Sequence, residues 1–399
     1  MKVAIVHYWL VGMRGGEKVL EALCELWPEA DIFTHVVVPN ALSERLRRHK
    51  IQTSFVAKLP RAAAWYKAYL PLMPLALEQF DLRDYDLVIS SESGPAKGIV
   101  APPHAVHICY CHSPMRYVWN MYHDYRRSGG RLARISMPLL MHYLRMWDLS
   151  SANRVDTFIA NSHNVAARIR RYYQRDSHVV YPPVNVDAFG PVTDSASDDF
   201  YLMVGELVRY KRPDLAVEAF NASGKHLVII GGGEMLGELQ RNARPNVEIL
   251  GSQPFDTIRS HYRRCRALIF PGEEDFGIVP VEAMAAGRPV IALGRGGARE
   301  TVIDGVTGIL FDSQTSADLS RAIARLEATN FEPRAIAAHA RAFDTSRFKS
   351  QMQALVDVAL SERRASNARV PATAASSLHA SPGWREATAE RQETERDAA

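Results

Sequence analysis

The chain has 399 residues, of which 47% are hydrophobic and 23% charged. That length exceeds the usual size of one hydrophobic core and predicts two domains, and the composition is ordinary for a soluble globular protein. Apolar runs such as 137-MPLLM-141 are too short to span a bilayer, which argues against an integral membrane protein. The N-terminal run alternates like a strand and enters a glycine turn without a small-residue cleavage site, so we interpret it as a strand and not as a signal peptide.

Charge is spread unevenly along the chain. Residues 1–190 hold 23 basic and 16 acidic residues, a net charge of +7, whereas residues 191–360 hold 19 and 22, a net charge of −3. A basic first half favours an anionic partner, either a phosphorylated acceptor or a membrane surface, although random surface charge explains so small an excess equally well.

The four cysteines lack the paired spacing of zinc sites or of secreted disulfide frameworks. This pattern predicts core thiols and a reducing, cytoplasmic compartment for Cys24, Cys109, Cys111 and Cys265.

Short apolar strands alternate with amphipathic helical segments from the start of the chain. Strands are expected at 2–8, 86–91, 106–111 and 156–162, with a helix over 17–27. A polar, turn-rich stretch at 193–199 is typical of a linker. The pattern then restarts, with strands expected at 200–205, 226–231, 247–251, 267–271 and 290–293.

Strands separated by helices predict parallel sheets with right-handed crossovers, and therefore an α/β protein of two facing Rossmann-like domains with a cleft between them. We expect the first domain at 1–190 and the second at 191–343. A helix at about 344–362 is expected to pack back on the first domain, and 364–399 is expected to be a disordered tail.

The segment most informative about function is 269-IFPGEEDFGIVPVEAMAAGRPVIALGRGGARETV-302. A buried strand ends at Pro271, an acidic turn follows, and a helix begins near Phe276. The N–H groups and positive dipole end of a helix N-terminus suit a diphosphate. Glu274 and Glu282 could accept hydrogen bonds from vicinal sugar hydroxyls on either side of it. By spacing alone, however, helix capping by Glu274 and a solvated Glu282 explain the pattern equally well.

The spacing Glu274-x7-Glu282, followed by Glu-Ala-Met, Gly-Arg-Pro-Val-Ile and Gly296-Gly297-x-x-Glu300, resembles the family 4 retaining glycosyltransferases of GT-B fold. The resemblance implies that Glu274 contacts the transferred hexose and that Glu282 holds the ribose. It also implies that backbone amides near Phe276, Gly277 and Ile278 meet the hexose and diphosphate.

A second donor segment is 204-VGELVRYKRPDLAVEAF-220. Lys211 lies between a strand and a helix, where it can neutralise a departing pyrophosphate. Where the family carries an arginine, this chain has Glu206, so either Arg209 or Arg212 is expected to supply that charge, with surface charge as an open alternative.

Glycine turns are expected to complete the donor site. Gly15 and Gly16 match the family's Gly-Gly loop beside the donor phosphates. The run 231-GGG-233 fails G-x-G-x-x-G, and Gly232 is expected to line the nucleotide pocket. Ser252 stands where the family packs the base, although a plain loop serine fits the sequence as well.

His112 follows a strand, at the edge where open α/β sheets bind ligands, and matches a family histidine that contacts the hexose. Arg116 is a candidate for an acceptor phosphate. Asp84-Tyr85-Asp86 mimics the Asp-x-Asp metal motif, but it precedes a strand as ordinary entry residues do. Because the GT-B class needs no such metal, we expect neither a metal nor another cofactor.

The stretches 45–80 and 126–147 interleave basic residues with aromatic and aliphatic ones. Such faces favour anionic lipid interfaces, although core helices with a cationic outer face explain them equally well. Peripheral attachment to the inner face of the plasma membrane therefore stays an alternative to a purely cytoplasmic location. The basic half contains no recognised nucleic-acid module, and no nucleic acid partner is expected.

The expected reaction, with retention implied by the resemblance, moves a hexose from a nucleotide sugar to a glycan or lipid-linked acceptor in cell-surface polysaccharide biosynthesis. The 112-HSPMRY-117 and 208-VRYKR-212 loops resemble bacterial mannosyltransferases, which favours GDP-mannose over UDP-sugars as the donor. A GT-B-fold sugar-nucleotide epimerase and a non-catalytic subunit of a polysaccharide assembly complex are the alternatives.

Overall fold

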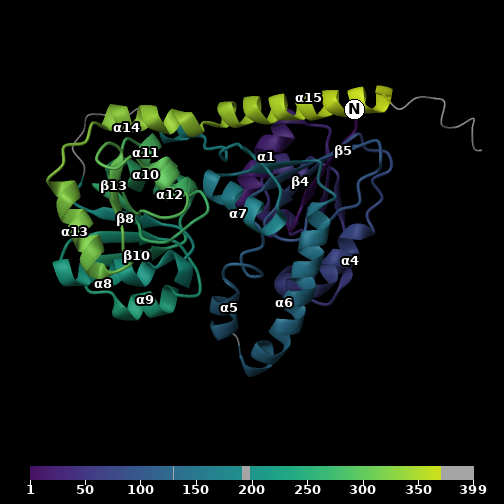
Figure 1. The fold of residues 1–399 in the computed structure, drawn as a ribbon. Coiled ribbons are helices and arrows are strands. Elements are labelled where there is room, and N and C mark those ends of the chain that lie inside the picture. The colour runs from purple at the N-terminus through teal and green to yellow at the C-terminus, as the bar shows by residue number, and fades with distance from the viewer. Residues whose placement is uncertain (129, 191–197, 370–399) are drawn as a thin grey trace, which may run out of the picture. The chain divides into compact units, whose positions relative to one another are not determined.

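The computed structural model describes residues 1–128, 130–190 and 198–369. The chain divides into two compact units, Met1–Ala354 and Leu355–Ala399, and both β-sheets belong to the first (Figure 1). Most of the linker predicted at 193–199 lies outside the described residues.

The first sheet is entirely parallel, with strand order β3-β2-β1-β4-β5-β6-β7. The inner strand β1 pairs on both sides, with its Ile5 opposite Ile32 of β2 and Ile89 of β4. The strands are β1 (Val3–His7), β2 (Asp31–Thr34), β3 (Ile51–Thr53), β4 (Leu87–Glu92), β5 (Val106–Cys111), β6 (Thr157–Ala160) and β7 (His178–Val179).

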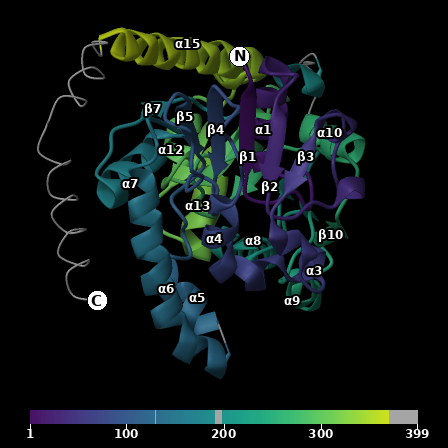
Figure 2. The same ribbon diagram turned by 90° about the vertical axis from the view of Figure 1, so that its right-hand side faces the viewer.

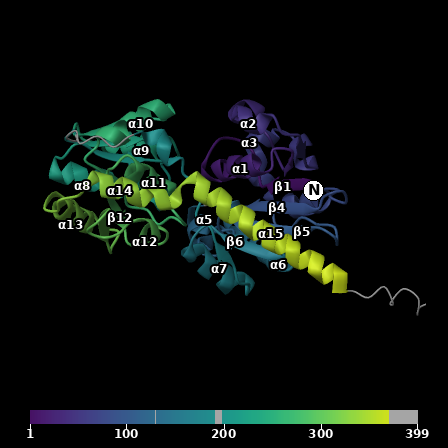
Figure 3. The same cartoon turned by 90° about the horizontal axis from the view of Figure 1, so that it is seen from above.

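Helices cover both faces of this sheet, with α1, α2 and α3 on one side and α6 and α7 on the other (Figure 3). The α-helices are α1 (Gly15–Leu26), α2 (Glu44–Arg47), α3 (Ala62–Trp65), α4 (Met73–Glu78), α5 (Tyr122–Ser128), α6 (Arg131–Ala152) and α7 (His163–Tyr173). The 3-10 helices are η1 (Pro39–Ala41), η2 (Phe55–Lys58), η3 (Tyr66–Leu72) and η4 (Val186–Phe189).

The second sheet is also parallel, in the order β10-β9-β8-β11-β12-β13. Its strands are β8 (Tyr201–Val204), β9 (Leu227–Ile230), β10 (Val247–Gly251), β11 (Ala267–Phe270), β12 (Val290–Leu293) and β13 (Gly308–Phe311). Its helices are η5 (Arg209–Lys211), α8 (Pro213–Ser223), α9 (Leu236–Asn242), α10 (Phe255–Arg264), α11 (Ile278–Ala285), α12 (Ala298–Thr301), α13 (Ser316–Glu327), α14 (Pro333–Ala340) and η6 (Arg341–Phe343).

Side chains alternate across this second sheet, as parallel strands covered on both faces require. Tyr201 and Met203 of β8 pack in the cluster with α8, α9 and α13, whereas Leu202 packs in the cluster with α10, α11 and α14. The two sheets are therefore Rossmann-like, and the α/β, GT-B architecture predicted from the sequence is confirmed.

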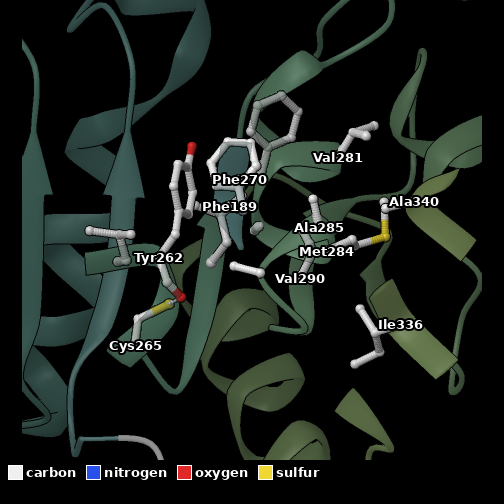
Figure 4. Packing of buried hydrophobic residues seen from close by; sticks show 14 of the residues in the cluster. Phe189, Tyr262, Cys265, Phe270, Val281, Met284, Ala285, Val290, Ile336 and Ala340 are labelled. Atoms are coloured by element: carbon white, nitrogen blue, oxygen red, sulfur yellow. Dashed lines mark hydrogen bonds between the residues drawn. The ribbon is translucent and has the colours of Figure 1, made fainter. Parts of the chain in front are cut away.

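The helix α11 is almost entirely apolar, and its residues from Pro280 to Ala285 are buried. Figure 4 shows Val281, Met284 and Ala285 of α11 among residues of β11, β12, α10 and α14. A helix that is hydrophobic all round belongs in a core, and this burial fixes the position of its N-terminal end.

The C-terminal helix α15 (Thr345–Arg369) begins where the sequence predicts. In its first turns, the Phe348 ring lies 5.6 Å from that of Tyr110, and Lys349 forms an ion pair with Glu25 of α1 at 2.8 Å. The disorder predicted from Arg364 is wrong as far as Arg369, because the helix continues there. Residues 370–399 of that predicted tail lie outside the described residues.

The four cysteines are buried and free, as the core-thiol interpretation predicts. Asp86 accepts a hydrogen bond from the backbone N–H of Lys2 at 2.7 Å, which is the role of a strand-entry residue. Among the helices that the structure describes, none combines the length and hydropathy needed to cross a membrane.

Candidate functional site

A cavity of about 490 Å³ lies where loops from the carboxyl ends of strands in both sheets converge. Open α/β sheets bind ligands at this edge, where the strand order reverses. The lining includes most of the residues singled out from the sequence, namely Gly15, Gly16, His112, Arg116, Lys211, Glu274, Phe276, Gly277, Ile278 and Glu282.

Glu274 and Lys211 face one another inside this cavity. The Lys211 Nζ lies 2.9 Å from a Glu274 carboxylate oxygen, and both side chains are mostly buried. Burial alone lowers the pKa of Lys211, but the Glu274 carboxylate and Tyr210 outweigh it and raise that pKa above its usual value. Lys211 is therefore a cation held in place by a carboxylate, ready to meet a second anion.

The glycine pair of the family motif supports the turn that carries Glu274. The Gly297 N–H donates to the Glu274 carbonyl at 2.9 Å, and a Cβ at Gly297 would lie 2.2 Å from the Cα of Phe276. Gly296 has a φ of +60°, and a Cβ there would lie 2.3 Å from the Glu274 carbonyl oxygen. Only glycines let these two backbones approach so closely.

Glu300 of the same motif stabilises an element of the first sheet's domain. Its carboxylate accepts hydrogen bonds from the backbone N–H groups of His163 and Asn164, at 2.8 and 2.9 Å. These groups open α7, where a negative charge is favoured by the helix dipole. The motif residue thus joins the two sheet domains.

Glu282 is buried to 7% exposure, so its interpretation as a solvated residue is wrong. One carboxylate oxygen lies 2.8 Å from the Lys18 Nζ, and the other accepts a hydrogen bond from the Tyr262 hydroxyl at 3.0 Å. Burial and the nearby Glu282 charge raise the pKa of Tyr262 well above its usual value, so this phenol remains a donor. A ligand hydroxyl that bound Glu282 would share or displace Lys18.

His112 lines the cavity, and its ring contacts the buried side chain of Ser91. Its Nε2 is 2.8 Å from the Ser91 hydroxyl, which also lies 3.1 Å from His7 Nδ1. A hydroxyl has one proton, so Ser91 can donate a hydrogen bond to only one of the two rings. Burial, with a smaller contribution from His7, lowers the pKa of His112 to about 3, and the ring is therefore neutral at physiological pH.

Gly15 and Gly16 are the first residues of α1, and both line the cavity. A Cβ at Gly16 would lie 2.5 Å from the Tyr8 hydroxyl, and one at Gly15 would lie 3.1 Å from the Cδ1 of Ile278. Ile278 begins α11, whose N-terminus at Gly277 carries no side-chain cap. Two helix N-termini thus meet at one cavity, an arrangement that favours an anion.

Arg209, Gly232 and Ser252 are not brought into the lining of this cavity. Arg209 is 70% exposed, with its guanidinium 3.6 Å from Glu238. A Cβ on Gly232 would lie 2.8 Å from the Ser252 hydroxyl, so these two residues adjoin one another.

The charge reversal at Glu206 has a partner in the other domain. Its carboxylate lies 3.7 Å from the guanidinium of Arg14, which lines the cavity. The alternative cation Arg212 pairs instead with Asp214 at 2.9 Å.

Arg116 also lines the cavity, but it shares its surroundings with residues that sequence reasoning missed. Its guanidinium lies 3.7 Å from Asp275 and over the ring of Tyr210. Asp275 pairs with Arg168 of α7 as well. Part of the positive charge of the first half is therefore used to hold the acidic turn of the second.

A second, larger cavity of about 850 Å³ shares Lys18, Ile278 and Glu282 with the first. Phe189 and Phe255 line its far side, with ring centroids 5.8 Å apart. Glu282 therefore lines both cavities.

Each sheet domain matches the model of a glycosyltransferase family. Residues 13–188 match the model for Glycosyltransferase Family 4, and residues 186–343 match that for Glycosyl transferases group 1.

Curated relatives include an uncharacterized glycosyltransferase of Methanocaldococcus jannaschii, 31% identical over 43% of this chain and 49% of the relative. A D-inositol 3-phosphate glycosyltransferase of Geodermatophilus obscurus is 30% identical over 55% of this chain and 56% of its own length. The chain thus spans about half the length of the curated relatives it matches.

Solved structures share the fold at lower identity. Sucrose-phosphate synthase of Thermosynechococcus elongatus has a TM-score of 0.70 at 20% identity, covering 91% of this chain and 100% of that one. HepE of Anabaena in complex with UDP has a TM-score of 0.67 at 17% identity, covering 90% and 100%.

Proposed function

Because the chain is GT-B in fold and both of its sheet domains match glycosyltransferase families, we propose that it transfers a hexose from a nucleotide sugar to a glycan or lipid-linked acceptor. We further propose retention at the anomeric carbon, GDP-mannose as the donor, and a role in cell-surface polysaccharide biosynthesis. The observation that carries the proposal is the convergence of Lys211, Glu274, Glu282 and two glycine-containing helix N-termini on one cavity.

The diphosphate is proposed to lie between the N-termini of α1 and α11. Backbone N–H groups at Gly16 and Ile278 and the ammonium of Lys211 would stabilise the charge that develops as the phosphate departs. Arg14 lines the same cavity and pairs with Glu206, so we propose that it supplies the cation that the family carries at position 206. Donor binding would then draw Arg14 away from Glu206.

Glu282 is proposed to hold the ribose, with the base extending toward Phe255 in the second cavity. In that arrangement Glu274 and His112 contact the hexose, and Lys211 exchanges Glu274 for the phosphate. Since His112 is neutral, it would act as a hydrogen-bonding group and not as a proton donor. The leaving phosphate would take the acceptor's proton, and Arg116 would meet a phosphate on the acceptor.

A thermal-shift panel of GDP-, UDP- and ADP-sugars tests this proposal. One nucleotide is expected to stabilise the wild type, and Glu282→Ala is expected to lose most of that shift. Glu248→Ala is a matched control, because Glu248 is 55% exposed on β10, where it pairs with His226 at 3.8 Å. Equal stabilisation of Glu282→Ala and the wild type would show that Glu282 does not bind the ribose.

The same panel separates the alternatives. UDP bound in HepE of Anabaena makes a UDP-sugar the main competitor of GDP-mannose, and a selective shift by UDP-sugars would decide for it. Conversion of donor without any acceptor would favour an epimerase, and the failure of every nucleotide sugar to bind would favour a non-catalytic subunit. We propose a cytoplasmic enzyme that meets a lipid-linked acceptor at an anionic membrane face, independent of metal and of other cofactors.

A further inference from the structure

One face of the long helix α6 exposes a stripe of large apolar side chains. Ile135 and Leu139 are 76% and 79% exposed, and Tyr143, Met146 and Leu149 are 42%, 55% and 44% exposed. The spacing of three or four residues places all five on one side of the helix. Large apolar side chains gathered in this way mark an interaction site more often than scattered single ones do.

The opposite face of α6 is already packed, so the exposed stripe is not an unfinished core. Met141 and Leu144 lie in a buried cluster with Met115 and Val118. Asp148, one turn further on, is fully buried and pairs with Lys97. The helix is therefore anchored along its inner side while its outer side remains open.

A second apolar segment adjoins α6. Leu72 and Leu75, at 40% and 53% exposure, lie on η3 and α4. Leu70 packs against the same cluster as Met141, and the Trp147 Nε1 donates to Glu78 at 3.3 Å, so α4 and α6 lie side by side (Figures 1 and 2). The two stretches with interleaved basic and apolar residues are therefore neighbours in the fold.

The sequence of this surface is mostly basic, and α5 carries one acidic residue, Asp124, beside Arg126 and Arg127. Arg126, Arg127 and Arg134 are exposed near the α5–α6 turn. The one acidic residue of α6, Asp148, is buried, and Glu78 of α4 pairs with Arg154 at 2.6 Å.

This charge pattern decides between two occupants. A two-fold dimer through this face would cover the apolar stripe, but α6 would bring no exposed carboxylate to the arginines, because its one acidic residue, Asp148, is buried. An anionic bilayer instead matches both parts, since acyl chains accept the apolar stripe and headgroups accept the arginines.

We propose that the outer face of α6, together with Leu72 and Leu75, adsorbs to an anionic lipid bilayer. The inference rests on the proposed function in one respect, namely that a lipid-linked acceptor gives such contact a use. The surface itself is independent of the donor site, because none of its residues lines the cavity that holds Glu274 and Glu282.

The test is co-sedimentation of the full chain with phosphatidylglycerol–phosphatidylcholine vesicles and with pure phosphatidylcholine vesicles. The wild type is expected to bind the anionic vesicles, and the double variant Ile135→Glu/Leu139→Glu is expected to bind them at least about ten-fold more weakly. Ile303→Glu/Val306→Glu is the matched control, since these residues are 46% and 51% exposed in the other sheet domain, and it should bind like the wild type.

Equal vesicle binding by the double variant and the control would overturn the proposal. So would a wild type that ignores vesicles but self-associates in light scattering, with self-association lost in the double variant. The nucleotide-sugar thermal shift, measured on the same variants, distinguishes this result from the proposed function. Retained nucleotide stabilisation with lost vesicle binding supports the surface, whereas vesicle binding without any nucleotide response leaves the surface intact and refutes the donor site.

Discussion

Replacement of Gly297 by alanine tests how the turn that carries Glu274 is held. The new Cβ would lie 2.2, 2.3 and 2.5 Å from the Cα, O and C atoms of Phe276. All three are backbone atoms, so no flexible side chain can move aside. With ordinary carbon contacts at about 3.5 Å, the turn must shift by roughly 1 Å.

A misplacement of about 1 Å in a group that positions the substrate costs a reaction about 100-fold, or about 2.7 kcal/mol. Overpacking of this kind costs only about 1–3 kcal/mol of stability. Gly297→Ala is therefore expected to stay folded while kcat/KM for the nucleotide sugar falls by about two orders of magnitude.

The assay combines transfer kinetics with calorimetric binding of the nucleotide. Gly237→Ala is the control, because a Cβ there would meet only Arg241 Nη1, at an ordinary 3.6 Å. That variant should keep wild-type activity. Wild-type binding and activity in Gly297→Ala would refute the view that the glycine pair sets the position of the donor turn.

The remaining predictions concern stability. Glu300→Gln should lower the free energy of unfolding by about 1–2 kcal/mol in urea titrations, because an amide has one acceptor oxygen and no charge to offer the N-terminus of α7. An unchanged unfolding midpoint would show that this contact does not stabilise the fold. Burial lowers the pKa of His35 and His107 to about 4, below the unfolded value of about 6.5. As the pH falls from about 6.5 to 4, only the unfolded chain takes up these protons, so each histidine should cost about 1.4 kcal/mol of stability per pH unit. The double variant His35→Gln/His107→Gln should show a smaller decrease of the unfolding free energy over this pH range. Lys97→Met should cost about 3–5 kcal/mol by leaving the Asp148 carboxylate buried without its cation, and a midpoint close to wild type would show that this ion pair contributes little.

Much of the fold follows from local sequence pattern. The strand predicted at 106–111 is β5, residue for residue. Of the other predicted strands, β1, β6, β8, β9, β10, β11 and β12 lie within their runs, and β4 ends one residue later than predicted, at Glu92. Most of these strands are buried on both faces, so they appear in the sequence as continuous apolar runs. The strands that were missed, β2, β3, β7 and β13, include an edge strand of two residues and one of three, which are too short for a periodic signal.

The start of α15 was predicted and its end was not. Alanine, serine and charged residues in its last turns resemble the tail that follows, and composition alone does not distinguish a polar helix from a disordered segment.

The sequence by itself determined the α/β architecture and the segment that supplies Glu274 and Glu282, because strand periodicity and the family spacing are local properties of the chain. Only the tertiary structure decided what faces those carboxylates. Lys18 meets Glu282 across 264 positions of sequence, and Arg14 meets Glu206 from the other domain. Such pairs form when two sheets bring their strand ends to one cavity, and no local pattern encodes which side chains then lie within 4 Å of each other.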